Sequence, residues 1–273
     1  MIDLGTDRGP AAIERVTLST DEMDLLLDRL EIDELPVVLD QFPRFDDVTA
    51  RNAAFDSAET TLTGRGLIED GEVHRGLAER LQILRRPHWV VALRLFVGDT
   101  VSRLCLAKGD DTVVLALRGP ESYVIDDAGA DLAGILVTAL GAADPLVFDG
   151  FSAPTQQLGE VFDNVGDAAA SMRRLAEIAV PKRDSNVIVS AMLHCYAHTE
   201  IVALVYGDGT RQQAENHIAV FDTRDGRFIA TASVAADGTK WSALSSGAVP
   251  RLRQAFNGLI AGLPDRSAFD PAP

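Results

Sequence analysis

Cysteine is scarce in this sequence of 273 residues, and its pattern rules out a scaffold built on disulfides. The two cysteines, Cys105 and Cys195, lie far apart, and neither belongs to a CxxC pair. Small secreted domains that depend on disulfides carry closely spaced, paired cysteines instead. We therefore expect a protein of a reducing compartment, with an apolar core that a chain of this length can bury without covalent links.

Long apolar runs are also missing. The longest, Trp89–Val97, is interrupted by Arg94 and is much shorter than the roughly 20 residues that cross a bilayer as a helix. The first residues, Met1–Glu14, have neither the basic region nor the apolar region of a secretory signal peptide. The sequence thus predicts a cytoplasmic protein with no membrane partner.

Basic side chains are in short supply. The chain has 25 Lys and Arg residues against 41 Asp and Glu residues, a net charge of −16. Such a charge repels nucleic acids and anionic lipid surfaces, because both are polyanions. The densest basic pair, Arg85-Arg86, lies at a predicted helix end, where cations interact with the last carbonyls. We therefore expect no nucleic-acid partner.

The familiar catalytic and cofactor motifs are absent. There is no GxxxxGK[ST] loop, and Gly207-Asp208-Gly209 lacks the third glycine of a dinucleotide fingerprint. In Gly150–Pro154, proline stands where the second glycine of a GxSxG nucleophile elbow belongs. The paired aspartates fall at predicted turns and helix starts, where they cap backbone amides. The sequence predicts no enzyme and no cofactor.

One cluster, His194, Cys195 and His198, has side chains that bind metals. The two histidines would share a helix face at i and i+4, with His217 as a distant third ligand. However, the glutamate of an HExxH motif is missing, and the predicted helix ends near Cys195. A surface pair beside a buried thiol is the simpler interpretation, so we expect no metal site.

Two tryptophans, Trp89 and Trp241, each lie in a predicted strand. Core packing is the usual role of a strand tryptophan, and the alternative is an interface role. We predict that both belong to the core.

The first part of the chain predicts helices followed by a β-meander. Thr20 is the expected N-cap of the first helix. The expected helices cover 20–30, 46–63, about 73–86 and about 130–140. The expected strands cover 14–18, 89–97, 101–107, 112–117 and 122–125, and turn sequences separate the last four.

The second part repeats this plan. The segment 184–195 favours a strand by its Val-Ile-Val propensity and a helix by its spacing, and we interpret it as a helix capped by Asp184. The expected helices cover about 156–162, 167–178, 184–195 and 249–263. The expected strands cover 200–206, 217–223, 227–233 and 240–244, with hairpin turns at Asp225-Gly226 and Asp237-Gly238.

These two parts predict the fold class. We expect an α+β protein with a central antiparallel sheet, helical bundles and two similar halves related by a quasi-two-fold axis. The N-terminal half covers 13–142, a connector covers 143–165, and the C-terminal half covers 166–264 of a single globular domain. Chance similarity of two meanders is an alternative explanation of the repeat.

Several segments together resemble a known family. The segment 216–263 contains His-Ile-Ala-Val-Phe-Asp-Thr-Arg-Asp-Gly-Arg-Phe and then Ser-Val-Ala-Ala-Asp-Gly-Thr-Lys-Trp, and it ends in Leu-Ile-Ala-Gly-Leu-Pro. The N-terminal segments Val16–Leu18, Leu35–Leu39 and Gly66–Ile68 contribute as well. In order and over nearly the whole chain, they resemble the EspG proteins, secretion-associated proteins of the ESX (type VII) systems of mycobacteria and related actinobacteria.

The resemblance implies a cytosolic chaperone without catalysis. Family members bind the PPE subunit of a PE–PPE heterodimer at its helical tip, keep it soluble and direct it to its own ESX system. They hold the partner by the sheet, by a loop between early strands and by the C-terminal helical bundle. On this basis the candidate partner-binding residues are Asp99, Thr100, Asp208, Arg211, Gln212, Gln213, Phe228, Arg253 and Phe256. Four of them belong to a polar hairpin segment, 207–215, which we expect to project from the sheet as an exposed loop.

Two departures bear on this implication. The early loop is long in several relatives but is only Gly98-Asp99-Thr100 here, and Ser245-Ser246-Gly247 stands where relatives often have a Pro-Gly pair. The alternatives are an enzyme or small-molecule-binding protein with a site between the halves, or an adaptor for a different protein partner.

Overall fold

The computed structural model describes residues 13, 15–162, 166–207 and 209–266, and these residues form two compact units. Unit 1 comprises residues up to Pro87 together with Cys105–Ala128, and unit 2 comprises His88–Leu104 and the chain from Gly129 onward. The α+β class with a large antiparallel sheet is confirmed. The predicted halves and the axis between them stay predictions. No described helix combines the length and the apolar character needed to cross a membrane.

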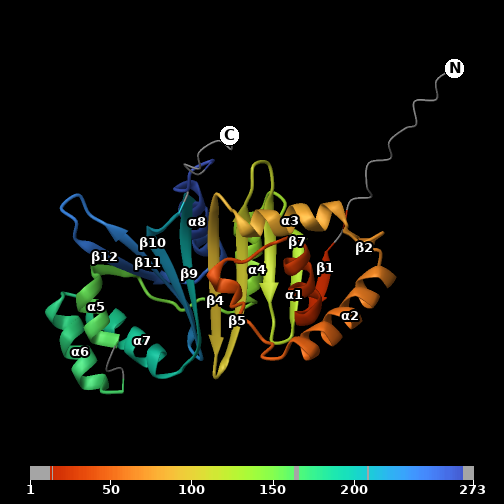
Figure 1. The fold of residues 1–273 in the computed structure, drawn as a ribbon. Helices are drawn as coiled ribbons and strands as arrows, with labels where there is room; N and C mark the ends of the chain where they lie inside the picture. The colour runs from red at the N-terminus through yellow and green to blue at the C-terminus, as the bar shows by residue number, and fades with distance from the viewer. Residues whose placement is uncertain (1–12, 14, 163–165, 208, 267–273) are drawn as a thin grey trace. The chain divides into compact units, whose positions relative to one another are not determined.

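Unit 1 packs helices against antiparallel strands (Figure 1). Its helices are α1 (Thr20–Arg29), η1 (Val37–Leu39), α2 (Val48–Gly64) and α3 (Arg75–Arg85). Its strands are β1 (Val16–Ser19), β2 (Ile68–Glu69), β3 (Glu72–Val73), β6 (Val113–Arg118) and β7 (Ser122–Asp127), with part of β5 (Thr100–Lys108). Strand β7 pairs with β1 and with β6, and the short ribbon β2–β3 joins α2 to α3.

Local sequence explains where the helices of unit 1 begin. The predicted N-cap Thr20 is wrong by one residue, because Ser19 caps α1 in a capping box with Glu22. The Ser19 hydroxyl accepts from the Glu22 amide at 3.1 Å, and the Glu22 carboxylate accepts from the Ser19 amide at 2.7 Å. The Asp47 carboxylate caps α2 by accepting from the Thr49 amide at 3.1 Å, without a capping box. Leucines at helical spacing on α1 and α3 are fully buried and form the core of this unit.

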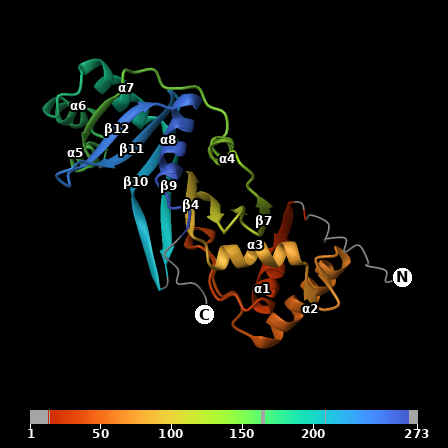
Figure 2. The same ribbon diagram turned by 90° about the horizontal axis from the view of Figure 1, so that it is seen from above.

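Unit 2 contains six consecutive strands of the large antiparallel sheet, in the order β4-β9-β10-β11-β12-β8. Its strands are β4 (Trp89–Val97), β8 (Phe151–Pro154), β9 (Cys195–Gly207), β10 (Thr210–Thr223), β11 (Gly226–Val234) and β12 (Lys240–Ser246). Its helices are α4 (Leu132–Leu140), α5 (Thr155–Phe162), α6 (Ala168–Glu177), α7 (Lys182–Leu193) and α8 (Val249–Ala261). Helices α5–α7 form one group, and α8 lies beside β10 (Figures 1 and 2).

The core of unit 2 joins α5–α7 to the last strands of the sheet. Leu158, Leu175 and Ile188, one from each helix, pack with Phe228 and Leu244 from β11 and β12. The helical interpretation of 184–195 is therefore correct, because Ile188 and its neighbours bury one helix face here. Its predicted N-cap is wrong: Pro181 is the N-cap residue of α7 and offers no side-chain cap, and Asp184 is buried inside the first turn.

Candidate partner-binding surface

The hairpin of β9 and β10 carries most of the predicted contact residues. The pairing runs without a loop from Thr210 opposite Gly207 to Gln213 opposite Leu204. The expected exposed loop over 207–215 is therefore wrong, because Arg211 and Gln212 lie within β10 and pair with Tyr206 and Val205. The side chains from Thr210 to Gln213 are nevertheless exposed, whereas Asp208 lies outside the described residues.

In this hairpin β10 is exposed on both faces, unlike an ordinary half-buried strand. Side chains alternate along a strand, so Arg211 and Gln213 share one face and Gln212 points to the other. Both faces of β10 are solvated here, and the strand forms because β9 supplies apolar partners such as Val205. Pairing decides the strand in this stretch, where the composition of β10 alone indicates a loop.

The pairing of β10 with β9 contains a register shift. Gln213 pairs with Leu204 and His217 pairs with Val202, so the three residues 214–216 face the single residue Ala203. Extra residues of this kind bend a strand and end its regular pairing. Among the described residues, β10 pairs with β11 only from Ile218 opposite Thr231 onward. The two strands thus form a β10–β11 fork, with residues 210–217 on one arm and 232–234 on the other.

A hollow of about 290 Å³ lies at this fork, between the strands and α8. It is lined by Asn216, His217, Ile218, Thr231, Ala232, Arg251, Gln254, Ala255, Gly258 and Leu259. A Cβ atom added at Gly258 would meet no atom within 4 Å, so the wall of the hollow is open at this point. The fork therefore offers a small concave surface of mixed polar and apolar character beside the exposed hairpin.

The short turn Gly98-Asp99 lies at the other end of β9. Val97 pairs with Ala197, whereas Arg211 pairs with Tyr206, nine positions further along the same strand. At about 3.4 Å per residue, these two predicted contact points are about 30 Å apart. Asp99 and Thr100 are both exposed. A partner that contacts both points must span about the length of a 20-residue helix.

The three remaining predicted contact residues lie in β11 and α8. Phe228 and Phe256 are both 0% exposed, so neither side chain is accessible to a partner. Arg253 is half exposed and forms a two-bond ion pair with Asp131, with both N–O distances at 2.9 Å. The hydrogen bond from Arg253, followed by that from the Gly134 amide, lowers the pKa of Asp131. This contact joins α8 to the N-cap of α4.

Trp241 lies near the fork and corrects a prediction. Its side chain is 37% exposed, so its assignment to the core is wrong, whereas Trp89 is buried as expected. Trp241 pairs with Ser233 of β11, one position beyond the lining residue Ala232. The hollow itself does not follow from the sequence pattern, although an isolated glycine within a helix, Gly258, is a recognised sign of close packing or function.

The proposed metal ligands are not brought together on a helix. Helix α7 ends at Leu193, and Cys195 already begins β9. His194 lies 3.6 Å from Asp225, and the His198 ring stacks on Phe96 with 4.5 Å between ring centroids. In the part of the chain that the structure describes, no group of three or more His, Cys, Asp or Glu side chains is arranged to hold a metal ion.

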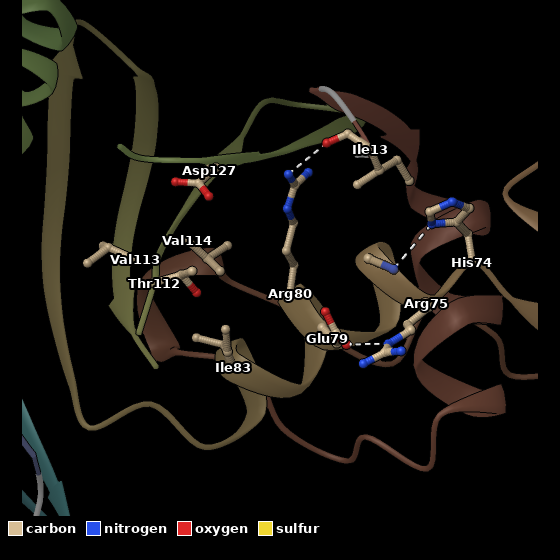
Figure 3. A pocket seen from close by; sticks show the side chains of 11 residues that line it. Ile13, His74, Arg75, Glu79, Arg80, Ile83, Thr112, Val113, Val114 and Asp127 are labelled. Carbon is tan, nitrogen blue, oxygen red and sulfur yellow. Dashed lines mark hydrogen bonds and ion pairs between the residues drawn. The ribbon is translucent and has the colours of Figure 1, made fainter. Parts of the chain in front are cut away.

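A further hollow, of about 470 Å³, lies within unit 1 between α3 and β6 (Figure 3). Its charged side chains bind the chain itself. Arg80 donates to the Ile13 carbonyl at 2.7 Å, and Arg75 pairs with Glu79 at the same distance. The His74 ring caps α3 by accepting from the Gly76 amide. These side chains therefore stabilise α3 and its contacts, and they give no reason to assign a substrate to the hollow.

Comparison with known proteins agrees with this architecture over nearly the whole chain. The ESX-1 secretion-associated protein EspG1 of Mycobacterium tuberculosis H37Rv is 25% identical, with 93% of this chain and 89% of that protein covered. The ESX-3 secretion-associated protein EspG3 of M. tuberculosis CDC 1551 is 26% identical, with 96% and 95% covered. The fold of the present chain matches that of the type VII secretion chaperone EspG5 of M. tuberculosis, which was solved in complex with the PE25–PPE41 dimer. The TM-score is 0.78 and the sequence identity 16%, with 93% of this chain and 98% of EspG5 covered. Because the EspG family profile matches residues 19–257, the chain belongs to the EspG family.

Proposed function

We propose that this protein is a non-catalytic cytoplasmic chaperone that binds a PE–PPE heterodimer through its PPE subunit and delivers it to a type VII secretion system. The observation that carries the proposal is the family match across residues 19–257, together with the fold shared with a chaperone that was solved bound to a PE–PPE dimer. An excess of acidic side chains suits this role, since net charge keeps a protein soluble beside an aggregation-prone partner.

The surface that we assign to the PPE subunit comprises the exposed β9–β10 hairpin and the β10–β11 fork. The hairpin supplies polar groups, of which the Arg211 guanidinium is a planar donor. The fork supplies concavity, and Trp241 supplies an exposed aromatic side chain nearby. Interfaces commonly combine an anchored apolar centre with a polar rim in this way.

The same stretch of β10 has a simpler account. Polar side chains and a bulge on an open strand edge prevent aggregation, and they need no partner to explain them. The two accounts differ in one respect: edge protection requires no open wall on α8, whereas partner binding uses the hollow beside Gly258.

The test is co-purification with a PE–PPE pair encoded in the same genome, followed by calorimetry. Gly258→Trp fills the hollow, and we expect it to weaken binding by at least about tenfold. Gly64→Trp is the matched control, because Gly64 also lies in a helix with no atom within 4 Å of an added Cβ. Arg211→Glu reverses the charge on the hairpin and should weaken binding by about 1–3 kcal/mol.

Two results would contradict these assignments. Unchanged affinity of both variants would place the PPE contact elsewhere on the chain. Failure of the wild-type protein to bind any PE–PPE pair of its genome would remove the chaperone proposal itself.

A further inference from the structure

A second hollow in unit 1, which the proposed function does not use, lies between α1, α2 and the segment that joins them. Its volume is about 480 Å³, and the α1–α2 groove, as we call it, is lined among others by Asp28, Glu31, Asp33, Phe42, Phe45 and Phe55. All of its lining residues come from positions 24–55, so a single stretch of chain builds the groove.

The groove presents aromatic side chains to solvent. Phe42 is 65% exposed, and Phe45 packs edge-to-face against Phe55 with 6.2 Å between ring centroids. Val37 and Val48, which precede Phe42 and follow Phe45 in the sequence, are 65% and 70% exposed. Several large apolar side chains exposed within one short segment mark an interaction surface more often than a random surface feature.

The charge around these rings is strongly negative. Between positions 21 and 47 the sequence has ten acidic and two basic side chains, a net charge of −8, which is half of the −16 of the whole chain. The two arginines that line the groove are already engaged: Arg44 pairs with Asp21 and Asp24, and Arg51 pairs with Asp28. No ion pair joins Glu31 or Asp33 to a cation within the described ranges. The groove therefore keeps unneutralised carboxylates beside exposed aromatic rings.

The groove's own arginines show which ligand chemistry the rings accept. The Arg44 guanidinium lies 5.0 Å from the centre of the Phe45 ring, and that of Arg51 lies 4.5 Å from the centre of the Phe55 ring. A cation over an aromatic face is stabilised by the ring quadrupole, and a nearby carboxylate adds a Coulombic attraction for the same cation. Phe42, which lines the same groove as Glu31 and Asp33, offers a further exposed ring, and no described arginine lies over it.

We propose that the α1–α2 groove binds a basic segment of a protein partner, in which an Arg or Lys stem packs on Phe42 and its cation faces Glu31 and Asp33. Charge complementarity favours this occupant over the others. Nucleic acids and anionic membranes are repelled, and a second copy of this chain would bring two acidic surfaces together. The groove is lined by residues from 24–55 and the hollow assigned to PPE by residues from 216–259, so the two sites share no residue and we assign the basic segment a site of its own.

The experiment measures fluorescence anisotropy of a labelled peptide of alternating leucine and arginine with the full-length protein at physiological salt. A peptide with glutamate in place of arginine is the probe control. We expect the basic peptide to bind and the acidic one not to bind. Phe42→Ser, and separately Glu31→Gln with Asp33→Asn, should each weaken binding by about tenfold.

The matched control changes the same number of charges elsewhere. Glu121→Gln with Glu177→Gln also removes two exposed carboxylates, neither of which lines the groove. It should change the affinity by less than about twofold, because it leaves in place the carboxylates that face the bound cation. All substituted side chains are exposed, so unchanged melting curves are expected for every variant.

The proposal is overturned by any of four results. The first two are that the basic peptide does not bind, or that the groove pair and the control pair weaken its binding equally. The other two are that Phe42→Ser binds the basic peptide as tightly as the wild-type protein does, or that the groove variants lose PE–PPE binding. The last result would make the groove part of the chaperone surface, whereas failure of the chaperone proposal alone leaves peptide binding in the groove intact.

Discussion

Two tryptophans, both in strands, meet different surroundings in unit 2. Trp89 is 4% exposed on β4, whereas Trp241 is 37% exposed on β12. Both lie in segments whose composition favours a strand, and composition alone does not show which face of a strand a second layer will cover. Only the packing of helices on the sheet separates the two residues.

The first residue-scale prediction concerns this difference. Trp89→Ala should destabilise the fold by about 3–5 kcal/mol, because it leaves a cavity where a large buried side chain was removed. Trp241→Ala should cost about 1 kcal/mol, because much of its surface is already in water. Urea unfolding with an unchanged slope provides the measurement. A loss of stability at Trp241 equal to that at Trp89 would contradict the exposed placement.

The Arg227 side chain connects β11 to β10 and to α4. It is 3% exposed and makes two hydrogen bonds to Asp222, at 2.5 and 3.0 Å. It also donates to the carbonyls of Leu140 and Gly141 at 2.8 Å each, which lie at the C-terminus of α4. A cation here satisfies the last carbonyls and interacts favourably with the helix dipole.

At the scale of elements, this contact predicts that Arg227 holds α4 to the β10–β11 hairpin. Arg227→Met leaves a buried aspartate unpaired and should cost about 3–5 kcal/mol. Arg227→Lys should recover little, because an ammonium group lacks the planar fork that reaches both Asp222 and the carbonyls.

The double variant Arg227→Met with Asp222→Leu is the control for this prediction. It removes the uncompensated charge, so it should be more stable than Arg227→Met alone when both are measured by urea unfolding. A double variant that is no more stable would show that the ion pair itself is not the cause.

Elements with a clear period could be predicted from the sequence. The leucine-spaced helices and most of the meander strands agree with the structure within a few residues, because burial of one face imposes the pattern. Strand β10 is an exception, since it begins at Thr210 and not at the expected residue 217. Strand β8 was missed because it is four residues long and ends in proline at the edge of the sheet. The start of β9 was placed five residues late, since His198 and Thr199 interrupt the apolar pattern.

The candidate site could be predicted only in part. The polar stretch Arg211–Gln213 was identified and its exposure is as expected, but its strand conformation depends on pairing with β9. The fork depends on two extra residues in β10, and only the partner strand shows that they are extra. Phe228 and Phe256 were chosen as contact residues because of their position in the resemblance, and a linear sequence does not show that both side chains point into the core.

At the scale of the whole molecule, the net charge of −16 is spread unevenly along the chain. The segment 21–47 is about a tenth of the chain, and its ten acidic and two basic side chains give it half of the net charge of the whole chain. Most ion pairs of this region, such as Arg44 with Asp21, have partly exposed partners. Exposed pairs of this kind contribute little stability, so repulsion among the remaining carboxylates is not offset by them.

The last prediction follows from this imbalance. Raising NaCl from about 20 mM to about 500 mM shortens the Debye length from roughly 20 Å to roughly 4 Å and screens the repulsion. We expect a gain on the order of 1 kcal/mol in the free energy of unfolding, seen as a rise of about 2–4 °C in Tm. Glu31→Gln with Asp33→Asn should reduce this rise more than Glu121→Gln with Glu177→Gln, since the first pair lies where acidic charge is densest. A Tm that falls with salt would mean that ion pairs, rather than repulsion, dominate the electrostatics of the folded chain, and equal effects of the two pairs would mean that the charge acts without regard to position.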